Sequence, residues 1–311
     1  MIAIETIGLR KVFGRFRKKV VAVDNLNMKI EKSTIHGFIG PNGAGKTTTI
    51  KMLIGAVRPT KGKAFIFGER AGSVKAKSYI GYAPEHPNFY SMAAIDFLVY
   101  MGMLSGLERG EARKRAKELL ELFNLYDFRE KNASTFSAGM KQKLCLAQAL
   151  ISNPEILILD EPTANLDPIG RYEVLQIIKN LVKKERKTAF ISSHILHELE
   201  EIVDHVTIIK KGKTILQSSI SDLRKKFSEN HFIVDTSDNK SFLKILEKKS
   251  DVIKAWMNHK NKIEVLVKNG NKFKKEVVEL LAGKNIYLNE FSPYKISLEN
   301  IFLKIMGREN G

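Results

Sequence analysis

The spacing of apolar residues changes twice along the chain and divides it into three parts. Residues 2–9 and 20–30 alternate in short β-like runs joined by a basic loop, which predicts an antiparallel flap at the N-terminus. From residue 34 onward apolar strands alternate with amphipathic helices, which predicts an α/β fold with helices on both faces of a parallel sheet. The strands are expected at residues 35–39, 156–159 and 188–191, and the first helix at residues 46–53.

The β-like runs disappear between residues 86 and 151. Helical periodicity replaces them in three segments, residues 95–104, 113–123 and 138–150. We therefore expect a helical subdomain, about residues 86–151, to be inserted into a sheet domain that covers residues 1–218.

The remaining residues, 219–311, are rich in lysine and asparagine and alternate between strand and helix. The pattern is strand, helix, strand, strand, helix, strand, at residues 231–235, 242–248, 252–257, 263–267, 274–281 and 286–291. That order is the split βαβ of a ferredoxin-like fold. A small α+β domain is thus predicted to follow the larger one, and an amphipathic helix is expected to close the chain.

Composition limits the class of protein without choosing its partners. With 43% apolar and 28% charged residues, the 311-residue chain has the composition of an ordinary globular protein. The excess of 52 Lys+Arg over 34 Asp+Glu, a net charge of +18, favours contact with nucleic acid, anionic lipid or phosphate-bearing ligands. Charge alone does not decide among these three.

The cysteine content and the length of the longest apolar run limit the compartment of the protein and its relation to the membrane. Cys145 is the single cysteine, which excludes an internal disulfide and a cysteine-based zinc site and suits a reducing compartment. Its apolar neighbours predict a buried thiol. The longest apolar stretch, residues 97–107, is shorter than the ~20 residues that span a bilayer, so a membrane role is expected only through a partner.

A glycine-rich loop lies between the strand at 35–39 and the helix at 46–53. It satisfies G-x-x-x-x-G-K-[ST], a phosphate-binding loop in its required context. Its backbone N–H groups are expected to face the phosphates, Lys46 to neutralise them and Thr47 to offer its hydroxyl to Mg²⁺. The sequence thus predicts a P-loop NTPase core that binds ATP and Mg²⁺ through Gly40, Pro41, Asn42, Gly43, Ala44, Gly45, Lys46, Thr47 and Thr48.

Two adjacent acids follow the apolar strand at 156–159. Ligands collect at the carboxyl ends of strands in open α/β sheets, so Asp160 is expected to contact the Mg²⁺. Glu161 is then placed to take a proton from the water that attacks the γ-phosphate.

A third motif, Ser137-Ala138-Gly139-Met140-Lys141-Gln142, opens a helix shortly before the acidic pair. It resembles the signature sequence of the ABC-type ATPases. The resemblance implies that Ser137 and Gly139 hold the γ-phosphate of ATP bound to a second subunit, so that two nucleotides are enclosed in a dimer. Residues 1 to about 218 carry this resemblance.

The resemblance assigns roles to four further residues. It implies that Phe13 stacks on adenine, that Asp167 links the two sites across the dimer and that His194 contacts the γ-phosphate. It also places Glu85 where the family usually has a metal-sensing glutamine. His194 and His197 are spaced as a zinc pair could be, but the absence of a nearby thiol argues against zinc.

The same resemblance, with the ending Ser297-Leu298-Glu299-Asn300-Ile301-Phe302, points to stand-alone exporter subunits. It implies a partner permease, a second ATPase subunit, most simply an identical one, and a place at the cytoplasmic face of the membrane. Two alternatives stay open: an ABC-type ATPase that acts on nucleic acid or ribosomes, and a nucleotide binder without turnover. One phosphate loop and no heptad repeat disfavour the first, and Glu161 together with His194 disfavours the second.

Overall fold

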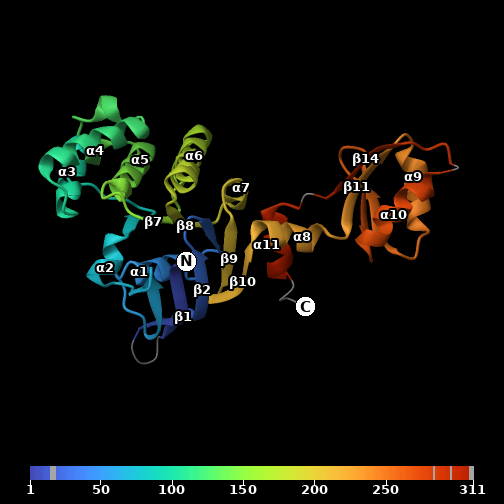
Figure 1. Cartoon of the computed structure of the whole chain (residues 1–311), viewed down its shortest axis with the longest axis horizontal. Coiled ribbons are helices and arrows are strands. Elements are labelled where there is room, and N and C mark those ends of the chain that lie inside the picture. Colours follow the sequence, from blue (N-terminus) through green and yellow to red (C-terminus); the bar gives the residue numbers. More distant parts are fainter. Residues whose placement is uncertain (15–18, 283, 295, 308–311) are drawn as a thin grey trace. The chain divides into compact units, whose positions relative to one another are not determined.

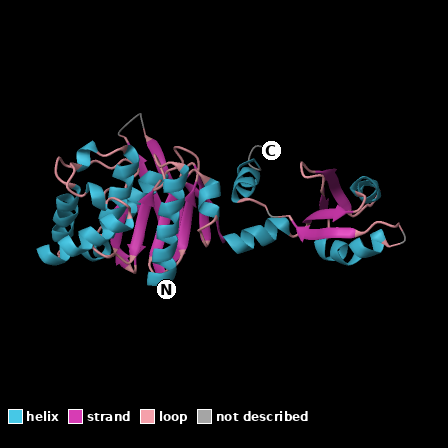
Figure 2. Ribbon diagram, turned by 90° about the horizontal axis from the view of Figure 1, so that it is seen from above, coloured by secondary structure: helices cyan, strands magenta, loops and turns pink. Residues whose placement is uncertain are grey.

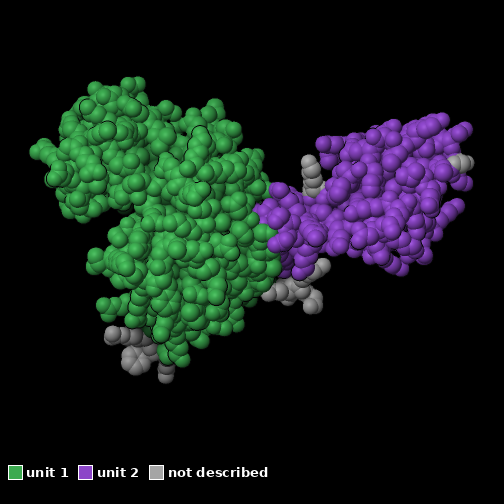
Figure 3. Space-filling view, in the orientation of Figure 1, with its two compact units in different colours: residues 1–219 green, residues 220–311 purple. Residues whose placement is uncertain are grey.

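The computed structural model describes residues 1–14, 19–282, 284–294 and 296–307. Residues 15–18, in the basic loop of the expected flap, lie outside these ranges. The chain divides into two compact units, Met1–Ser219 and Ile220–Gly311 (Figure 3). Each unit has its own sheets and helices and is described by itself.

The N-terminal flap of the first unit is a four-stranded antiparallel sheet in the order β2-β1-β4-β5. Its strands are β1 (Ile2–Phe13), β2 (Val20–Glu31), β4 (Lys61–Ile66) and β5 (Glu69–Arg70). Burial alternates along β2, where Leu26, Met28 and Ile30 turn inward. The flap predicted from β1 and β2 is confirmed, and β4 and β5 enlarge it.

The second sheet of this unit has six strands in the order β10-β9-β3-β8-β7-β6. They are β3 (Ile35–Ile39), β6 (Ile80–Ala83), β7 (Ile156–Asp160), β8 (Thr188–Ser193), β9 (His205–Lys210) and β10 (Lys213–Ser219). All neighbouring strands pair in parallel except β9 and β10, which are antiparallel. Strands β3, β7 and β8 are buried at every residue, as expected for a parallel sheet covered on both faces.

Helices cover both faces of this sheet (Figures 1 and 2). Helix α1 (Lys46–Leu53) lies between the two sheets, where Ile50, Met52 and Leu53 join the core formed by their facing residues. Helices α5 (Ala138–Leu150) and α6 (Pro168–Glu185) cover the opposite face (Figure 1). Two short helices also belong to this unit, α2 (Val74–Ser78), which contacts β5 of the flap, and α7 (Leu196–Glu200). The predicted α/β fold is confirmed.

The inserted helical segment contains α3 (Ala94–Leu104), α4 (Arg109–Leu122) and α5, with 3-10 turns at Tyr126–Phe128 and Ala133–Thr135. Helix α5 has the predicted bounds. Helix α4 begins at Arg109 rather than at residue 113, because the buried Ala112 belongs to the same apolar stripe as Ala116 and Leu119.

The lone thiol is buried in α5. Cys145 is 1% exposed, and burial raises its pKa to about 12. Because the thiolate is the reactive form, we expect native protein at about pH 8 to resist alkylation by iodoacetamide. Denatured protein should react fully under the same conditions. Mass spectrometry of both samples checks this, and rapid labelling of the native chain would contradict the packing around α5.

The second unit contains a four-stranded antiparallel sheet in the order β12-β13-β11-β14. Its elements are α8 (Ile220–Ser228), β11 (His231–Thr236), α9 (Asn239–Glu247), β12 (Val252–Met257), β13 (Ile263–Val267), α10 (Gly270–Leu281), β14 (Leu288–Pro293) and α11 (Leu298–Gly307). Helices α9 and α10 pack Phe242 and Phe273 against Phe232 and its neighbours in the sheet. The predicted ferredoxin-like order is confirmed, although β14 begins two positions later than expected, at Leu288. None of the helices in the described parts of the chain is long and apolar enough to cross a bilayer.

Candidate nucleotide-binding site

The phosphate-binding loop connects β3 to α1 in the conformation that its glycines allow. Gly43 and Gly45 have φ angles of 76° and 104°, which residues with a side chain rarely adopt. A Cβ atom on Gly45 would also come within 2.4 Å of the carbonyl oxygen of Ala22 in β2. Glycine at position 45 therefore lets the loop pass close beneath the flap.

The lysine of the loop is held inside the site. Lys46 is 7% exposed, and its Nζ donates a hydrogen bond to the Gly40 carbonyl at 2.8 Å. The same Nζ lies 3.7 Å from Oε1 of Glu161. A buried ammonium at the start of a helix is suited to bind the oxygens of a polyphosphate.

A cavity of about 570 Å³ opens above the loop. Its lining is Phe13, Val20, Val21, Ala22, Pro41, Asn42, Gly43, Ala44, Gly45, Lys46, Thr47, Thr48, Glu85, Glu161 and His194. The structure thus brings Phe13, Glu85, Glu161 and His194 to the loop, although they are far apart in sequence. Sequence reasoning missed Val20, Val21 and Ala22, which begin β2 beside Phe13. Their apolar character at the start of the predicted strand 20–30 was the available signal.

The two ends of the cavity differ in chemistry. Phe13, 42% exposed, and its neighbours Val20 and Val21 form an apolar surface suited to a flat base. Lys46 and the loop backbone make the other end cationic and rich in donors. The chemistry of the cavity therefore fits a nucleotide, with its base at the apolar end and a chain of phosphates at the other.

The acidic pair at the end of β7 is bound to the next strand, β8. Asp160 is buried, and its Oδ1 accepts a hydrogen bond of 2.5 Å from the Ser192 hydroxyl. Sequence reasoning did not identify Ser192. Asp160 is not among the residues that line the cavity. Burial, with a smaller contribution from Asp160, raises the pKa of nearby Tyr82 to about 12, so that phenol stays neutral.

Glu161 adopts a strained backbone conformation that aims its carboxylate into the cavity. Its φ angle is 49°, a conformation that costs about 1–2 kcal/mol for a residue with a side chain. Its N–H lies 3.1 Å from both the carbonyl oxygen and the hydroxyl of Ser192. Strain of this kind is common where a side chain must be held for chemistry.

His194 contacts the same carboxylate from the end of β8. Its Nδ1 is 2.9 Å from Oε2 of Glu161, and its backbone N–H donates to that oxygen at 3.3 Å. Glu161 is therefore hydrogen-bonded to His194 and paired with Lys46 on the other side. A carboxylate oriented in this way can accept a proton from a water molecule in the cavity.

Besides Asp160, four predicted residues are not among those that line this cavity: Gly40, Ser137, Gly139 and Asp167. Gly40 takes part only through its carbonyl, which accepts the bond from Lys46. Ser137 is exposed and caps α5, accepting a hydrogen bond from the Met140 N–H at 3.2 Å. Gly139 lies in the first turn of the same helix. Asp167 is also exposed and caps α6 through the Gly170 N–H at 2.7 Å.

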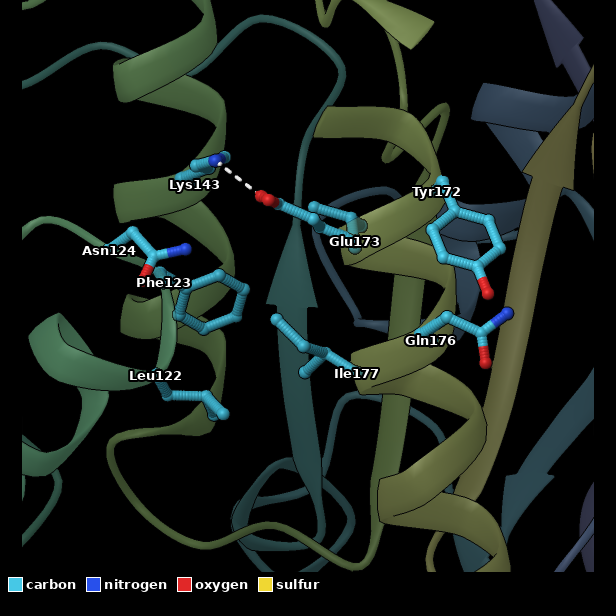
Figure 4. Close-up of a pocket in the computed structure, with 9 residues that line it drawn as sticks. Leu122, Phe123, Asn124, Lys143, Tyr172, Glu173, Gln176 and Ile177 are labelled. Atoms are coloured by element: carbon cyan, nitrogen blue, oxygen red, sulfur yellow. Dashed lines mark hydrogen bonds and ion pairs between the residues drawn. The ribbon is translucent and has the colours of Figure 1, made fainter. Parts of the chain in front are cut away.

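A separate groove of about 290 Å³ lies between the end of α4, α5 and α6 (Figure 4). Leu122, Phe123 and Ile177 give it an apolar floor, and an ion pair between Lys143 and Glu173 lies at its edge. It contains none of the predicted site residues. The predicted site residues that share a cavity in the described structure are those above the phosphate loop.

The comparisons with known proteins agree with this geometry. The ABC transporter family matches residues 23–164, and the C-terminal domain of DrrA1-3-like ATP-binding proteins matches residues 219–306. The bacitracin transport ATP-binding protein BcrA of Bacillus licheniformis is 36% identical over 307 residues, which are 98% of this chain and 97% of that protein. An uncharacterized ABC transporter ATP-binding protein, YxlF of Bacillus subtilis, is 34% identical over 92% of this chain and 94% of its own length.

Solved structures give the same result for the fold. The structure of an ATP-binding subunit of an ABC transporter has a TM-score of 0.65 and 29% identity, and the match covers 72% of this chain and 93% of that one. A dimeric bacterial ABC transporter cassette, MJ0796, has a TM-score of 0.65 at 22% identity over 70% of this chain and 98% of its own, a likeness in fold. The resemblance stated from the motifs is confirmed: this chain belongs to the ATP-binding proteins of ABC transporters, a family of ATP-hydrolysing subunits.

Proposed function

We propose that this chain drives an exporter by closing with a second copy around two ATP-Mg²⁺ molecules. The single observation that carries the proposal is the cavity in which Lys46, Glu161 and His194 meet the phosphate loop. Within it, Glu161 acts as general base and His194 orients the attacking water. Phe13 and residues 40–48 bind the base and the phosphates.

The residues present fit a magnesium ion at the phosphate end of the cavity. Thr47 and Glu85 line it, and Asp160, bonded to Ser192, directly precedes Glu161, which also lines it. These hydroxyl and carboxylate oxygens are hard ligands of the kind that Mg²⁺ prefers. When bound, the ion would offset the charge of the phosphates, and Glu85 would accept hydrogen bonds from its waters more strongly than the usual glutamine.

A second subunit would give a role to three of the predicted residues that do not line the cavity. Ser137, Gly139 and Asp167 all lie at exposed helix starts, where N–H groups and the helix dipole favour an anion or a polar partner. In a closed dimer, Ser137 and Gly139 would contact the γ-phosphate held by the partner. Asp167 would meet the partner beside that site.

The two units then divide the work. Residues 1–218, with the helical subdomain at about 86–151, form the ATPase domain, and residues 219–311 form an accessory or dimerisation domain. The protein would lie at the cytoplasmic face of the membrane, held there by a permease. The likeness to a bacitracin transport protein supports a transport role over action on nucleic acid.

The permease contact is expected in the segment from Glu85 to Asp96 and the adjoining helices. Tyr90 is 66% exposed. Phe89 packs edge-on against Phe97, with the ring centroids 5.0 Å apart. Because an aspartate at position 90 would place a charge in an apolar interface, Tyr90→Asp should abolish transport and leave basal ATP hydrolysis unchanged. Transport into inverted vesicles and phosphate release from the purified subunit measure the two activities.

A matched control is Tyr172→Asp, since Tyr172 is similarly exposed at 58% but lies in α6, outside this segment. It should retain transport.

Affinity purification from detergent-solubilised membranes should recover a protein with several apolar segments of ~20 residues. Recovery of no membrane protein, together with salt-dependent binding to RNA or DNA, would favour the nucleic-acid alternative instead.

A further inference from the structure

A buried carboxylate in α7 joins two segments of the site that are distant in sequence. Glu198 has a side chain that is 8% exposed, and each of its oxygens has a partner. The Thr163 hydroxyl donates to Oε2 at 2.8 Å, and Nη1 of Arg171 donates to Oε1 at 2.8 Å. Neither Glu198 nor these partners line the nucleotide cavity.

Arg171 extends this contact into the loop before α6. Its Nε donates to the Leu166 carbonyl at 2.8 Å, one residue before Asp167. Asp167 in turn caps α6 through the Gly170 N–H at 2.7 Å. The guanidinium therefore holds the loop of residues 163–167 against α7 as well as against its own helix.

The same two segments are joined a second time at the reacting end. Glu161 contacts His194 through Nδ1 at 2.9 Å and Ser192 through its N–H at 3.1 Å. Glu161 and Thr163 thus begin one segment, and His194 and Glu198 lie on the other. With contacts at both ends, neither segment can shift alone without separating a buried charge from its partner, which is strongly unfavourable.

We propose that Glu198, held by Thr163 and Arg171, is a positioning residue that fixes His194 relative to the loop bearing Asp167. A displacement of Asp167 would then be transmitted to the Glu161–His194 pair. The inference rests on the proposed function, in which Asp167 meets the partner subunit. Closure of the partner's nucleotide site, beside which Asp167 would lie, would in this way affect Glu161 and His194 in the site of this chain.

The test uses the full chain and two substitutions that alter the Glu198 contacts without reducing size. Glu198→Gln removes the charge that pairs with Arg171, and Thr163→Val removes the hydroxyl at nearly constant volume. Both should lower kcat by roughly 10- to 100-fold, as small misplacements of a reacting group do, with KM for ATP changed little. Both should also reduce the Hill coefficient for ATP, which can reach about 2 when two sites are coupled, to about 1.

Two controls separate positioning from simple loss of stability. Thr163→Ser keeps the hydroxyl and should restore both kcat and the Hill coefficient. Glu173 lies on α6, as Arg171 does, and forms an ion pair with Lys143 of α5 at 3.0 Å (Figure 4). Glu173→Gln breaks this pair. It should leave both quantities unchanged. Thermal unfolding midpoints of all variants, measured in parallel, identify any that fold poorly. If Glu198→Gln is one of them, Thr163→Val tests the inference in its place.

The outcomes distinguish this inference from the proposed function. A cooperative wild type whose kcat and Hill coefficient survive in folded Glu198→Gln and Thr163→Val would overturn the positioning role alone. A wild type with a Hill coefficient of about 1 would overturn the transmission between sites. If, in addition, ATP induced no dimer, the proposed function itself would be at fault.

Discussion

Replacing Glu161 by glutamine is expected to lower kcat for ATP by roughly 10²–10⁴-fold, the usual contribution of a general base. The amide keeps the size of the side chain and can still hydrogen-bond to His194 and to water. It cannot accept the proton that the attacking water must lose. Because the phosphate loop is untouched, ATP binding should persist.

Steady-state phosphate release and equilibrium binding of a fluorescent ATP analogue measure the two effects. The control is Glu155→Gln, at the other end of β7, where Glu155 forms an exposed ion pair with Lys32 at 2.7 Å. Surface pairs of this kind contribute little, so this variant should match the wild type. Wild-type turnover in Glu161→Gln would show that another group takes the proton.

The second large effect is expected on nucleotide affinity. Lys46→Ala removes the ammonium that faces the phosphates, and hydrogen bonds to charged groups are worth about 1.5–3 kcal/mol each, or roughly 10- to 100-fold in Kd. The substitution also leaves Glu161 without its cationic partner at 3.7 Å. Some loss of thermal stability should therefore accompany the loss of affinity.

Isothermal titration calorimetry with ATP-Mg²⁺ checks the affinity. Lys51→Ala is the matched control, because Lys51 lies in the last turn of the same helix α1 and is exposed. It should bind ATP as the wild type does. Unchanged affinity in Lys46→Ala would mean that the loop does not hold the phosphates as proposed.

The features that the sequence predicted well are those determined by neighbouring residues. The phosphate loop needs glycine at position 45, where φ is 104°, and that requirement is visible as a motif. The bounds of α5 follow from Ser137 as its cap and from unbroken helical periodicity. The order of strands and helices in the C-terminal unit could be predicted because it also follows from the local spacing of apolar residues.

The features that were missed depend on contacts between distant residues. Strand β10 pairs antiparallel with β9, and β4 joins the flap by pairing with β1, choices that no local pattern determines. Ser192 bonds to Asp160, and Glu198 to Thr163, across more than thirty positions. A serine near the end of a strand or a glutamate in a short helix carries no signal of such a partner until the strands are assembled.

The central element of the proposed function is the enclosure of two ATP molecules between two copies of the chain. Blocked hydrolysis should preserve the contacts to the γ-phosphate, so Glu161→Gln with ATP-Mg²⁺ should accumulate as a closed dimer. Adding Ser137→Arg, which places a bulky side chain at the exposed start of α5, should abolish the dimer while ATP still binds.

Light scattering after gel filtration in ATP-Mg²⁺ measures this directly. Enclosure of ATP between two copies predicts twice the 35.2 kDa chain mass for Glu161→Gln, and the single-chain mass for Glu161→Gln combined with Ser137→Arg. A Glu161→Gln protein that stays monomeric while saturated with ATP, or a dimer that tolerates arginine at position 137, would contradict it.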